Sequence, residues 1–128
     1  MRLLLDTQII LWSAFERTRL SRAATEALAN ETNTLYLSAV SAWELATKVP
    51  TGRLVLPETV PNFLNTQRRL LKLTDLPLTV AHAAAVAELP MIHRDPGDRL
   101  LVAQAMLEDL VLVTADRILQ RYPVRTLW

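Results

Sequence analysis

The sequence predicts an α/β fold: a three-layer α/β/α sandwich around a central, mainly parallel sheet. Short apolar runs alternate along the chain with segments of helical periodicity, which is the pattern of β-α-β units. A length of 128 residues with 51% hydrophobic residues suits one domain with its own core, spanning residues 1–128. Neither an internal repeat nor a linker interrupts this pattern.

The first third of the chain predicts a strand, two helices and a second strand. Residues 2–5 form an apolar run typical of a buried strand, and the apolar spacing after it suits a helix that follows directly. Ser21 is a candidate N-cap for a helix over residues 22–30. Residues 35–37 predict the second strand, which is brief.

The middle of the chain predicts two helices and a third strand. A helix over residues 39–49 is stopped by two strong breakers, Pro50 and Gly52. The next helix is expected over residues 58–71, with a proline in its first turn, where a missing N–H is tolerated. Residues 73–76 could form the third strand.

The last part of the chain predicts two helices, then a strand, a short helix and a strand. Thr79 is a plausible N-cap for an alanine-rich helix over residues 80–89. Asp95 and Pro96 resemble an N-cap followed by proline at the first helical position, which opens a long helix to about residue 108. The three final elements are expected at 111–114, 115–122 and 124–128.

The composition limits the kinds of site and location. The chain has no cysteine, which excludes a disulfide, a thiolate zinc site and a cysteine nucleophile and suits a reducing compartment. Asp6 and Gln8 interrupt the only run that resembles a signal peptide, and no apolar stretch reaches the roughly 18 residues of a membrane span. We therefore expect a cytoplasmic protein without a membrane segment.

The net charge of +1 neither requires nor excludes nucleic acid as a partner. Binding to a polyanion would need basic side chains concentrated locally. A solvated helix face is the simpler explanation of each basic cluster that the chain offers. These clusters are Arg17, Arg19 and Arg22, and Arg68, Arg69 and Lys72.

Four carboxylates follow the predicted strands. Asp6 ends the first strand, and Asp116 follows the fourth. Glu44 lies two turns into the helix after the second strand, and Asp98 lies in the first turn of the long helix. Ligands of parallel sheets bind outside the carboxyl ends of the strands, near a topological switch point. We therefore expect the four acids to share one rim of the sheet.

Each acid also has an ordinary structural explanation. Asp6 could cap its helix. Glu44 could close an S-x-x-E capping box that begins at Ser41, or pair with the lysine one turn on. Asp98 and Asp116 lie near helix N-termini, where the helix dipole favours acids. These explanations treat the acids separately and do not explain why all four should fall at one edge.

Carboxylates gathered at one rim need protons or a cation. Two of them 4 Å apart repel by about 4 kcal/mol at an effective dielectric constant near 20. The chain has no cysteine and two histidines, so a metal site would be built mainly from carboxylate oxygens. Such ligands favour Mg²⁺ or Mn²⁺ over zinc. Such an ion binds phosphate oxygens and activates water, so the residues predict metal-dependent phosphodiester hydrolysis. Thr7 and Thr114 could orient carboxylates or waters, or be ordinary turn and cap residues.

Five stretches, spread in order over nearly the whole chain, carry a family resemblance. They are LLLDT at 3–7, SAVSAWELATKVPTGRL at 38–54, LPLTVAHAAAVAELPMIHRDPGDRLLVAQA at 76–105, LVTAD at 112–116 and the closing VRTLW. Together they resemble a PIN-domain ribonuclease of the VapC toxin type. The resemblance implies an Mg²⁺- or Mn²⁺-dependent endoribonuclease that cleaves RNA, is inhibited by a cognate antitoxin protein and usually forms a homodimer.

The resemblance also implies roles for the four acids. Asp6 and Asp98 match the acids expected to bind the metal directly. Glu44 and Asp116 would complete the pocket through waters or a second ion, and one of them could help deprotonate the attacking water.

Two positions depart from the family pattern. Gln8 stands where close relatives commonly have histidine, and Gly97 stands where a bulky aromatic residue is usual. A glycine in the first turn lowers helix propensity by up to roughly 1 kcal/mol, so we expect a looser site.

Other residues near the acids carry weaker expectations. Arg94 and Arg99, with His93, could contact RNA phosphates, or lie in a solvated loop. His82 is expected on a helix surface. The tryptophans are expected in the core or at an interface rather than stacked on bases: Trp12, Trp43 and Trp128.

Three other functions compete with hydrolysis of RNA. A phosphatase with an aspartate nucleophile would need a second acid at the position of Gln8. A phosphorylated regulatory domain, with Asp75 as acceptor, would need paired acids near Asp6 and a lysine after the last strand. A catalytically weak or silent PIN-like module that acts through protein or RNA binding remains as the alternative.

Overall fold

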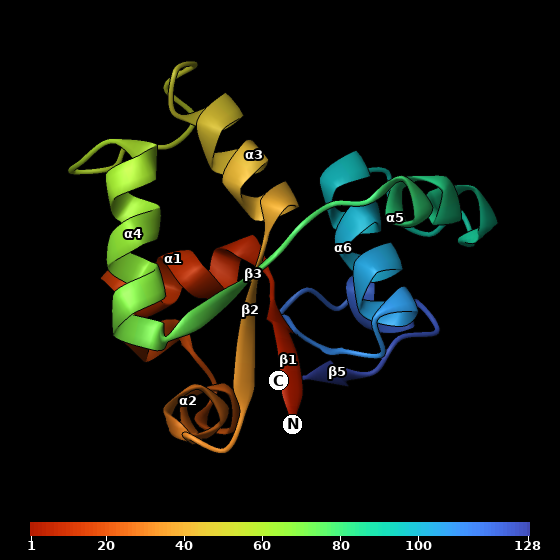
Figure 1. Cartoon of the computed structure of the whole chain (residues 1–128), viewed down its shortest axis with the longest axis horizontal. Coiled ribbons are helices and arrows are strands. Elements are labelled where there is room, and N and C mark those ends of the chain that lie inside the picture. The colour runs from red at the N-terminus through yellow and green to blue at the C-terminus, as the bar shows by residue number, and fades with distance from the viewer.

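Five parallel strands form the centre of the computed structural model, which describes all 128 residues (Figure 1). Their order across the sheet is β3-β2-β1-β4-β5. The predicted α/β/α class is confirmed, and the sheet is parallel throughout. The strands are β1 (Arg2–Leu5), β2 (Thr34–Ser38), β3 (Leu73–Leu76), β4 (Val111–Val113) and β5 (Thr126–Leu127).

Six α-helices and three short 3₁₀ helices connect the strands. No helix is both long and apolar enough to cross a membrane. The α-helices are α1 (Thr7–Phe15), α2 (Arg22–Ala29), α3 (Ala39–Lys48), α4 (Val60–Leu71), α5 (Val80–Ala85) and α6 (Pro96–Leu107). The 3₁₀ helices are η1 (Arg17–Arg19), η2 (Val86–Glu88) and η3 (Leu119–Arg121).

Two hydrophobic clusters cover the two faces of the sheet. Alternation along β1 sends Leu3 and Leu5 to the cluster under α1, α2 and α4, which also contains Phe63. Leu4 points to the opposite face and packs with Leu101 of α6. Helix α3 continues directly from β2 and rises beyond the carboxyl end of the sheet (Figure 1). This arrangement leaves the carboxyl ends of β1 and β4 between α1, α3 and α6.

Three predicted elements are shorter than expected. The alanine-rich helix ends at Ala85 and continues only as η2. The helix predicted over 115–122 is reduced to η3, because the Asp116 carboxylate accepts a hydrogen bond from the Ile118 N–H and holds the chain in a turn. The last strand is limited to β5.

His82 is buried, which corrects the expectation of a surface position. The Thr79 hydroxyl accepts from the His82 N–H at 3.1 Å, and His82 Nδ1 accepts from the Thr79 N–H at 3.0 Å. This is a reciprocal capping box at the start of α5. His82 Nε2 also lies 2.8 Å from Glu108 Oε1, so the ring joins α5 to the end of α6.

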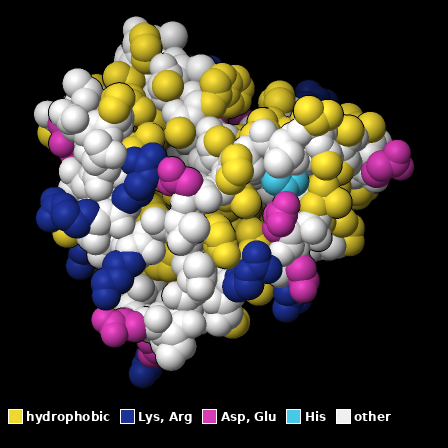
Figure 2. All heavy atoms as spheres, viewed as in Figure 1, with side chains coloured by type: hydrophobic (Ala, Val, Ile, Leu, Met, Phe, Trp, Pro, Cys, Tyr) yellow, Lys and Arg dark blue, Asp and Glu magenta, His cyan; other side chains and the backbone are white.

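The basic clusters do not form an uncompensated positive surface. Each contains arginine or lysine side chains that pair with nearby acids. On the face of the molecule drawn in Figure 2, basic and acidic side chains are interspersed. The pairs are Arg19–Glu16, Arg22–Glu26, Arg68–Asp75 and Lys72–Glu31.

Candidate functional site

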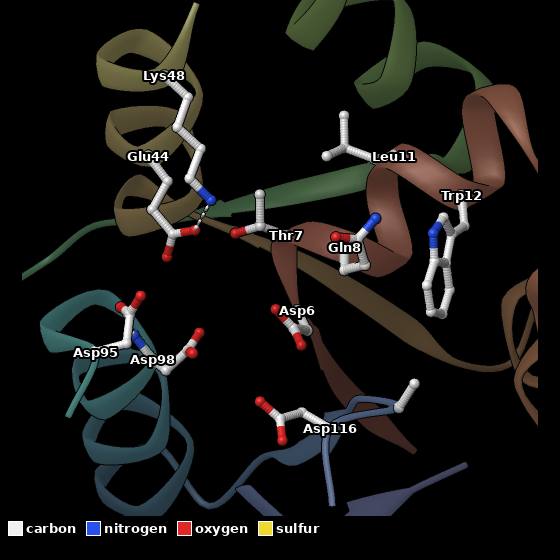
Figure 3. A pocket seen from close by; sticks show the side chains of 11 residues that line it. Asp6, Thr7, Gln8, Leu11, Trp12, Glu44, Lys48, Asp95, Asp98 and Asp116 are labelled. Atoms are coloured by element: carbon white, nitrogen blue, oxygen red, sulfur yellow. Dashed lines mark hydrogen bonds and ion pairs between the residues drawn. The ribbon is translucent and has the colours of Figure 1, made fainter. Parts of the chain in front are cut away.

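A pocket of about 320 Å³ opens at the carboxyl ends of β1 and β4 (Figure 3). From β1 the chain proceeds to β2 and β3 on one side, whereas β4 and β5 lie on the other, so this is the topological switch point of the sheet. The four predicted acids all line the pocket, and Asp95 joins them. The lining residues are Asp6, Thr7, Gln8, Leu11, Trp12, Glu44, Lys48, Asp95, Asp98, Ala115 and Asp116.

Asp6 lies at the base of this pocket with 8% of its surface exposed. Its N–H donates to the Val113 carbonyl, and its Oδ2 accepts from the Thr114 hydroxyl at 2.7 Å. Although Asp6 is the N-cap residue of α1, its side chain makes no capping hydrogen bond. Burial raises the pKa of Asp6, against the opposing effect of the Thr114 hydroxyl. Helix capping therefore does not explain this acid.

Thr114 connects the acids that follow β1 and β4. Its hydroxyl donates to Asp6 and accepts from the Asp116 N–H at 3.0 Å. Thr7, the other predicted supporting residue, instead donates to the Ser41 hydroxyl at 2.8 Å and ties α1 to α3. The two threonines thus fix the walls of the pocket in different ways.

Glu44 reaches the pocket from α3. The N-cap of this helix is Ser38, so the capping box predicted from Ser41 does not form. Burial raises the pKa of Glu44, and its Oε1 atom is buried without a hydrogen-bond partner. Its Oε2 lies 4.0 Å from Lys48 Nζ. A buried carboxylate oxygen without a donor is costly, and a cation in the pocket would satisfy it.

Asp98 also has a raised pKa, and its carboxylate lies among the other acids of the pocket. Burial, then the charges of Asp6 and other carboxylates, raise its pKa to about 8. The N-cap of α6 is Asp95, whose Oδ1 accepts from the Asp98 N–H at 3.1 Å. Asp98 itself therefore contributes its backbone to the cap and presents its carboxylate to the pocket (Figure 3).

Two groups of side chains have the spacing of metal ligands. Glu44, Asp95 and Asp98 form one, and His93, Asp98 and Asp116 form the other, with ligand atoms within 4.8 Å of one another. Asp98 is common to both groups. The sequence had indicated Asp95 only as a helix cap and His93 only as a possible phosphate contact. The dense HRDPGD stretch was the available signal for both residues.

Gly97 makes room for Glu44. A Cβ atom at position 97 would lie 2.5 Å from Glu44 Oε1 and 3.2 Å from Asp95 Oδ1. The glycine lets the Glu44 carboxylate approach the first turn of α6 closely. Gly97 therefore has two effects: it leaves space for the Glu44 carboxylate, and it lowers the helix propensity of the first turn of α6.

Arg99 does not face RNA, which corrects one expectation from the sequence. It is 7% exposed, and its guanidinium donates to the carbonyls of Pro90 and Val86 and to the Tyr122 hydroxyl. Through these hydrogen bonds the guanidinium holds the connection before α6 in place. Arg94 is exposed and makes no ion pair, so its proposed contact with phosphate is untouched by this correction.

The three tryptophans lie in different surroundings, and a place at an interface stays a prediction. Trp12 lines the pocket, with its ring centroid 6.0 Å from that of Trp128 and the Arg19 guanidinium 4.9 Å away. Trp43 is 55% exposed and lies outside the core.

The PIN-domain family pattern matches residues 3–124 of the chain. The chain belongs to this family. This PIN domain is 34% identical to Ribonuclease VapC22 of Mycobacterium tuberculosis over 119 residues. The aligned region covers 93% of this chain and 90% of that protein.

Solved structures share the PIN fold at lower identity. VapBC2 from Rickettsia felis, bound to a DNA fragment from its promoter, matches with a TM-score of 0.75 and 19% identity over 98% of this chain and 97% of that chain. DNA-bound VapBC from Salmonella typhimurium matches with a TM-score of 0.69 and 18% identity over 98% and 96%. At these identities the likeness concerns the fold.

Replacing Gly97 by alanine should disturb the pocket more than the fold. We expect Gly97→Ala to displace the Glu44 carboxylate and to weaken Mn²⁺ binding in calorimetric titration. The helix itself should tolerate the change, since alanine favours helix over glycine by up to about 1 kcal/mol. In a Glu44→Gln background the same substitution should weaken Mn²⁺ binding little further. An equal loss in both backgrounds would show that position 97 does not act through Glu44.

The raised pKa of Asp98 should make the metal-free protein less stable at high pH. The folded protein holds this proton up to a pH of about 8, whereas the unfolded chain releases it near the ordinary value of 3.8. The free energy of unfolding, measured in EDTA by urea titration, should therefore fall as the pH rises between these values.

Two variants test the assignment of that pH dependence to Asp98. Asp98→Asn should remove much of the fall and should stabilise the metal-free protein at pH 9. Glu58→Gln alters an exposed carboxylate without an ion pair and should retain the fall. Equal pH profiles for the wild type and Asp98→Asn would contradict the assignment.

Proposed function

We propose that this PIN domain is a divalent-metal-dependent endoribonuclease and the toxin of a toxin-antitoxin pair, with Mg²⁺ or Mn²⁺ as its cofactor. The observation that carries the proposal is the convergence of acids on Asp98 at the switch point, where burial and then the neighbouring carboxylates raise its pKa to about 8. Such a cluster favours a cation over solvent. The relative Ribonuclease VapC22 supports RNA as the substrate.

We assign the metal to Asp98 and to the acids that face it. Glu44 and Asp95 share one group of close oxygens with Asp98, and Asp6 faces Asp98 across the pocket (Figure 3). Asp116 is held by the Ile118 N–H on one oxygen, so we assign it a contact through water. The orphaned Oε1 of Glu44 fits this ligand set.

The ion would lower the pKa of a bound water and stabilise negative charge on the phosphodiester. The protein would hold the acids in place through the hydrogen bonds of Thr114 and of the α6 cap. We propose that Glu44, whose pKa is raised by burial, or Asp116 accepts a proton from the attacking water. Lys48 at the same wall offers a positive charge to a phosphate.

The remaining parts of the proposal concern partners and location. A cognate antitoxin protein would inhibit the enzyme, as the VapBC complexes among its structural relatives suggest. We also propose a cytoplasmic homodimer. Asp6, Glu44, Asp98 and Asp116 are the proposed catalytic and metal-binding residues, supported by Thr7 and Thr114, and Arg94 is a proposed contact for RNA.

Removal of a central acid should abolish cleavage of RNA. We expect purified protein, free of partner, to cut single-stranded RNA in Mg²⁺ or Mn²⁺. Asp6→Asn should lose at least about 100-fold, because even residues that only orient metal ligands typically contribute 10- to 100-fold. Asp75→Asn, which removes an exposed acid that pairs with Arg68, is the matched control and should remain active.

Metal removal gives the second arm of this experiment. EDTA should stop cleavage, and added Mn²⁺ should restore it. Cleavage that persists both in EDTA and in Asp6→Asn would contradict the metal site. Absence of cleavage under every condition would favour the silent module that acts only through binding.

A further inference from the structure

His93 lies at the edge of the acid pocket, between two elements that supply its carboxylates. Its Nε2 atom is 3.2 Å from Asp98 Oδ2 and 3.4 Å from Asp116 Oδ2. Asp98 belongs to the first turn of α6, whereas Asp116 follows β4. The imidazole therefore bridges acids that no backbone hydrogen bond connects directly. It is 19% exposed, so most of the ring is enclosed.

The other ring nitrogen shows which tautomer is present. His93 Nδ1 accepts a hydrogen bond from the Asp95 N–H at 3.0 Å. A nitrogen that accepts carries no proton, so the ring proton is on Nε2. The protonated Nε2 then lies beside the two carboxylates, at 3.2 and 3.4 Å, and has no lone pair for a metal. Although its spacing suits a ligand, His93 in this tautomer places an N–H group next to the acids.

The same hydrogen bond leaves Asp98 available to the pocket. In a capping box the third residue of the helix reaches back to the N–H of the cap residue, as His82 does to Thr79 in α5. In α6 the corresponding N–H, that of Asp95, is taken by His93 Nδ1. The Asp98 carboxylate is thereby released from a capping role.

The backbone of His93 is also held in place. Its N–H donates to the Tyr122 hydroxyl at 2.8 Å, and the same hydroxyl accepts from Arg99 at 3.1 Å. Arg99 further donates to the Pro90 carbonyl at 2.8 Å. This network explains why a buried arginine supports the connection before α6. It fixes the ring position before any ion enters the pocket.

We propose that His93 is a positioning residue that holds Asp98 and Asp116 at the spacing needed by the metal. The inference rests on the proposed function of the pocket. His93 contacts only the Oδ2 atom of each carboxylate, so Asp98 Oδ1 stays open to an ion. Donors of this kind orient metal ligands, and their loss typically weakens metal binding.

Two substitutions separate the two nitrogens of the ring. The Oδ1 of asparagine can replace Nδ1 as acceptor for the Asp95 N–H, but its amide is too short to reach the acids. The Nε2 of glutamine can replace the ring donor near Asp98 and Asp116. We expect His93→Asn to weaken Mn²⁺ binding by about 10- to 100-fold, and His93→Gln to retain most of it. Calorimetric titration of the partner-free full chain with Mn²⁺ measures both.

Cleavage assays add a readout that a merely structural role would not move. The Mn²⁺ concentration for half-maximal cleavage should rise in His93→Asn, whereas the rate at saturating Mn²⁺ should approach that of the wild type. As a matched control, His82→Gln alters a buried histidine outside the pocket. It should lower the unfolding midpoint and leave the affinity for Mn²⁺ unchanged.

The outcomes distinguish this inference from the function on which it rests. Wild-type affinity in His93→Asn would overturn the positioning role and leave the metal site intact. Equal losses in His93→Asn and His93→Gln would identify the imidazole as a ligand and also overturn it. A wild-type protein that binds no Mn²⁺ would overturn both the metal site and the role of His93.

Discussion

Repulsion among carboxylates at the sheet's switch point is the constraint on which the rest of the site depends. Two such groups 4 Å apart cost about 4 kcal/mol at an effective dielectric constant of 20, a large share of the stability of a small domain. Burial, and then this repulsion, raises the pKa of Asp98 to about 8, so the metal-free protein keeps that proton at neutral pH. A divalent cation would replace that proton and convert the repulsion into binding energy.

The fold keeps these acids together because hydrogen bonds within the protein fix most of them. One hydroxyl, that of Thr114, accepts from the Asp116 N–H and donates to Asp6, so β1 and β4 share it. Asp95 caps α6 by accepting a hydrogen bond from the Asp98 N–H, which fixes the first turn of the helix beside the pocket. Glu44 differs, since its position depends on the space that Gly97 leaves. The helices and strands thus present the acids before a cation binds.

Much of this arrangement could be predicted from the sequence, because residues that follow parallel strands share an edge. Asp6 and Asp116 were found in this way, and the capping signal of Asp95 and Pro96 predicted α6 with Asp98 in its first turn. Contacts between distant segments could not be predicted. His82, for example, is buried and its ring contacts Glu108, which lies 26 residues further along the chain at the end of α6. Asp95 caps α6 and also lines the pocket, and its place in the pocket likewise depends on how the connection before α6 is folded.

The protein is a PIN domain, and one of its relatives is a ribonuclease. The central claim of the account is that its clustered carboxylates exchange protons for a divalent cation. The most direct test of that claim is the number of protons released when Mn²⁺ binds, from calorimetry in buffers of different ionisation enthalpy. At pH 7 the account predicts that protons are released when the ion binds, because Asp98 is mostly protonated at that pH and the pKa values of Asp6 and Glu44 are also raised. Asp98 should contribute less to this release at pH 9, above its pKa. Binding of Mn²⁺ without proton release at pH 7, or no binding at all, would contradict it.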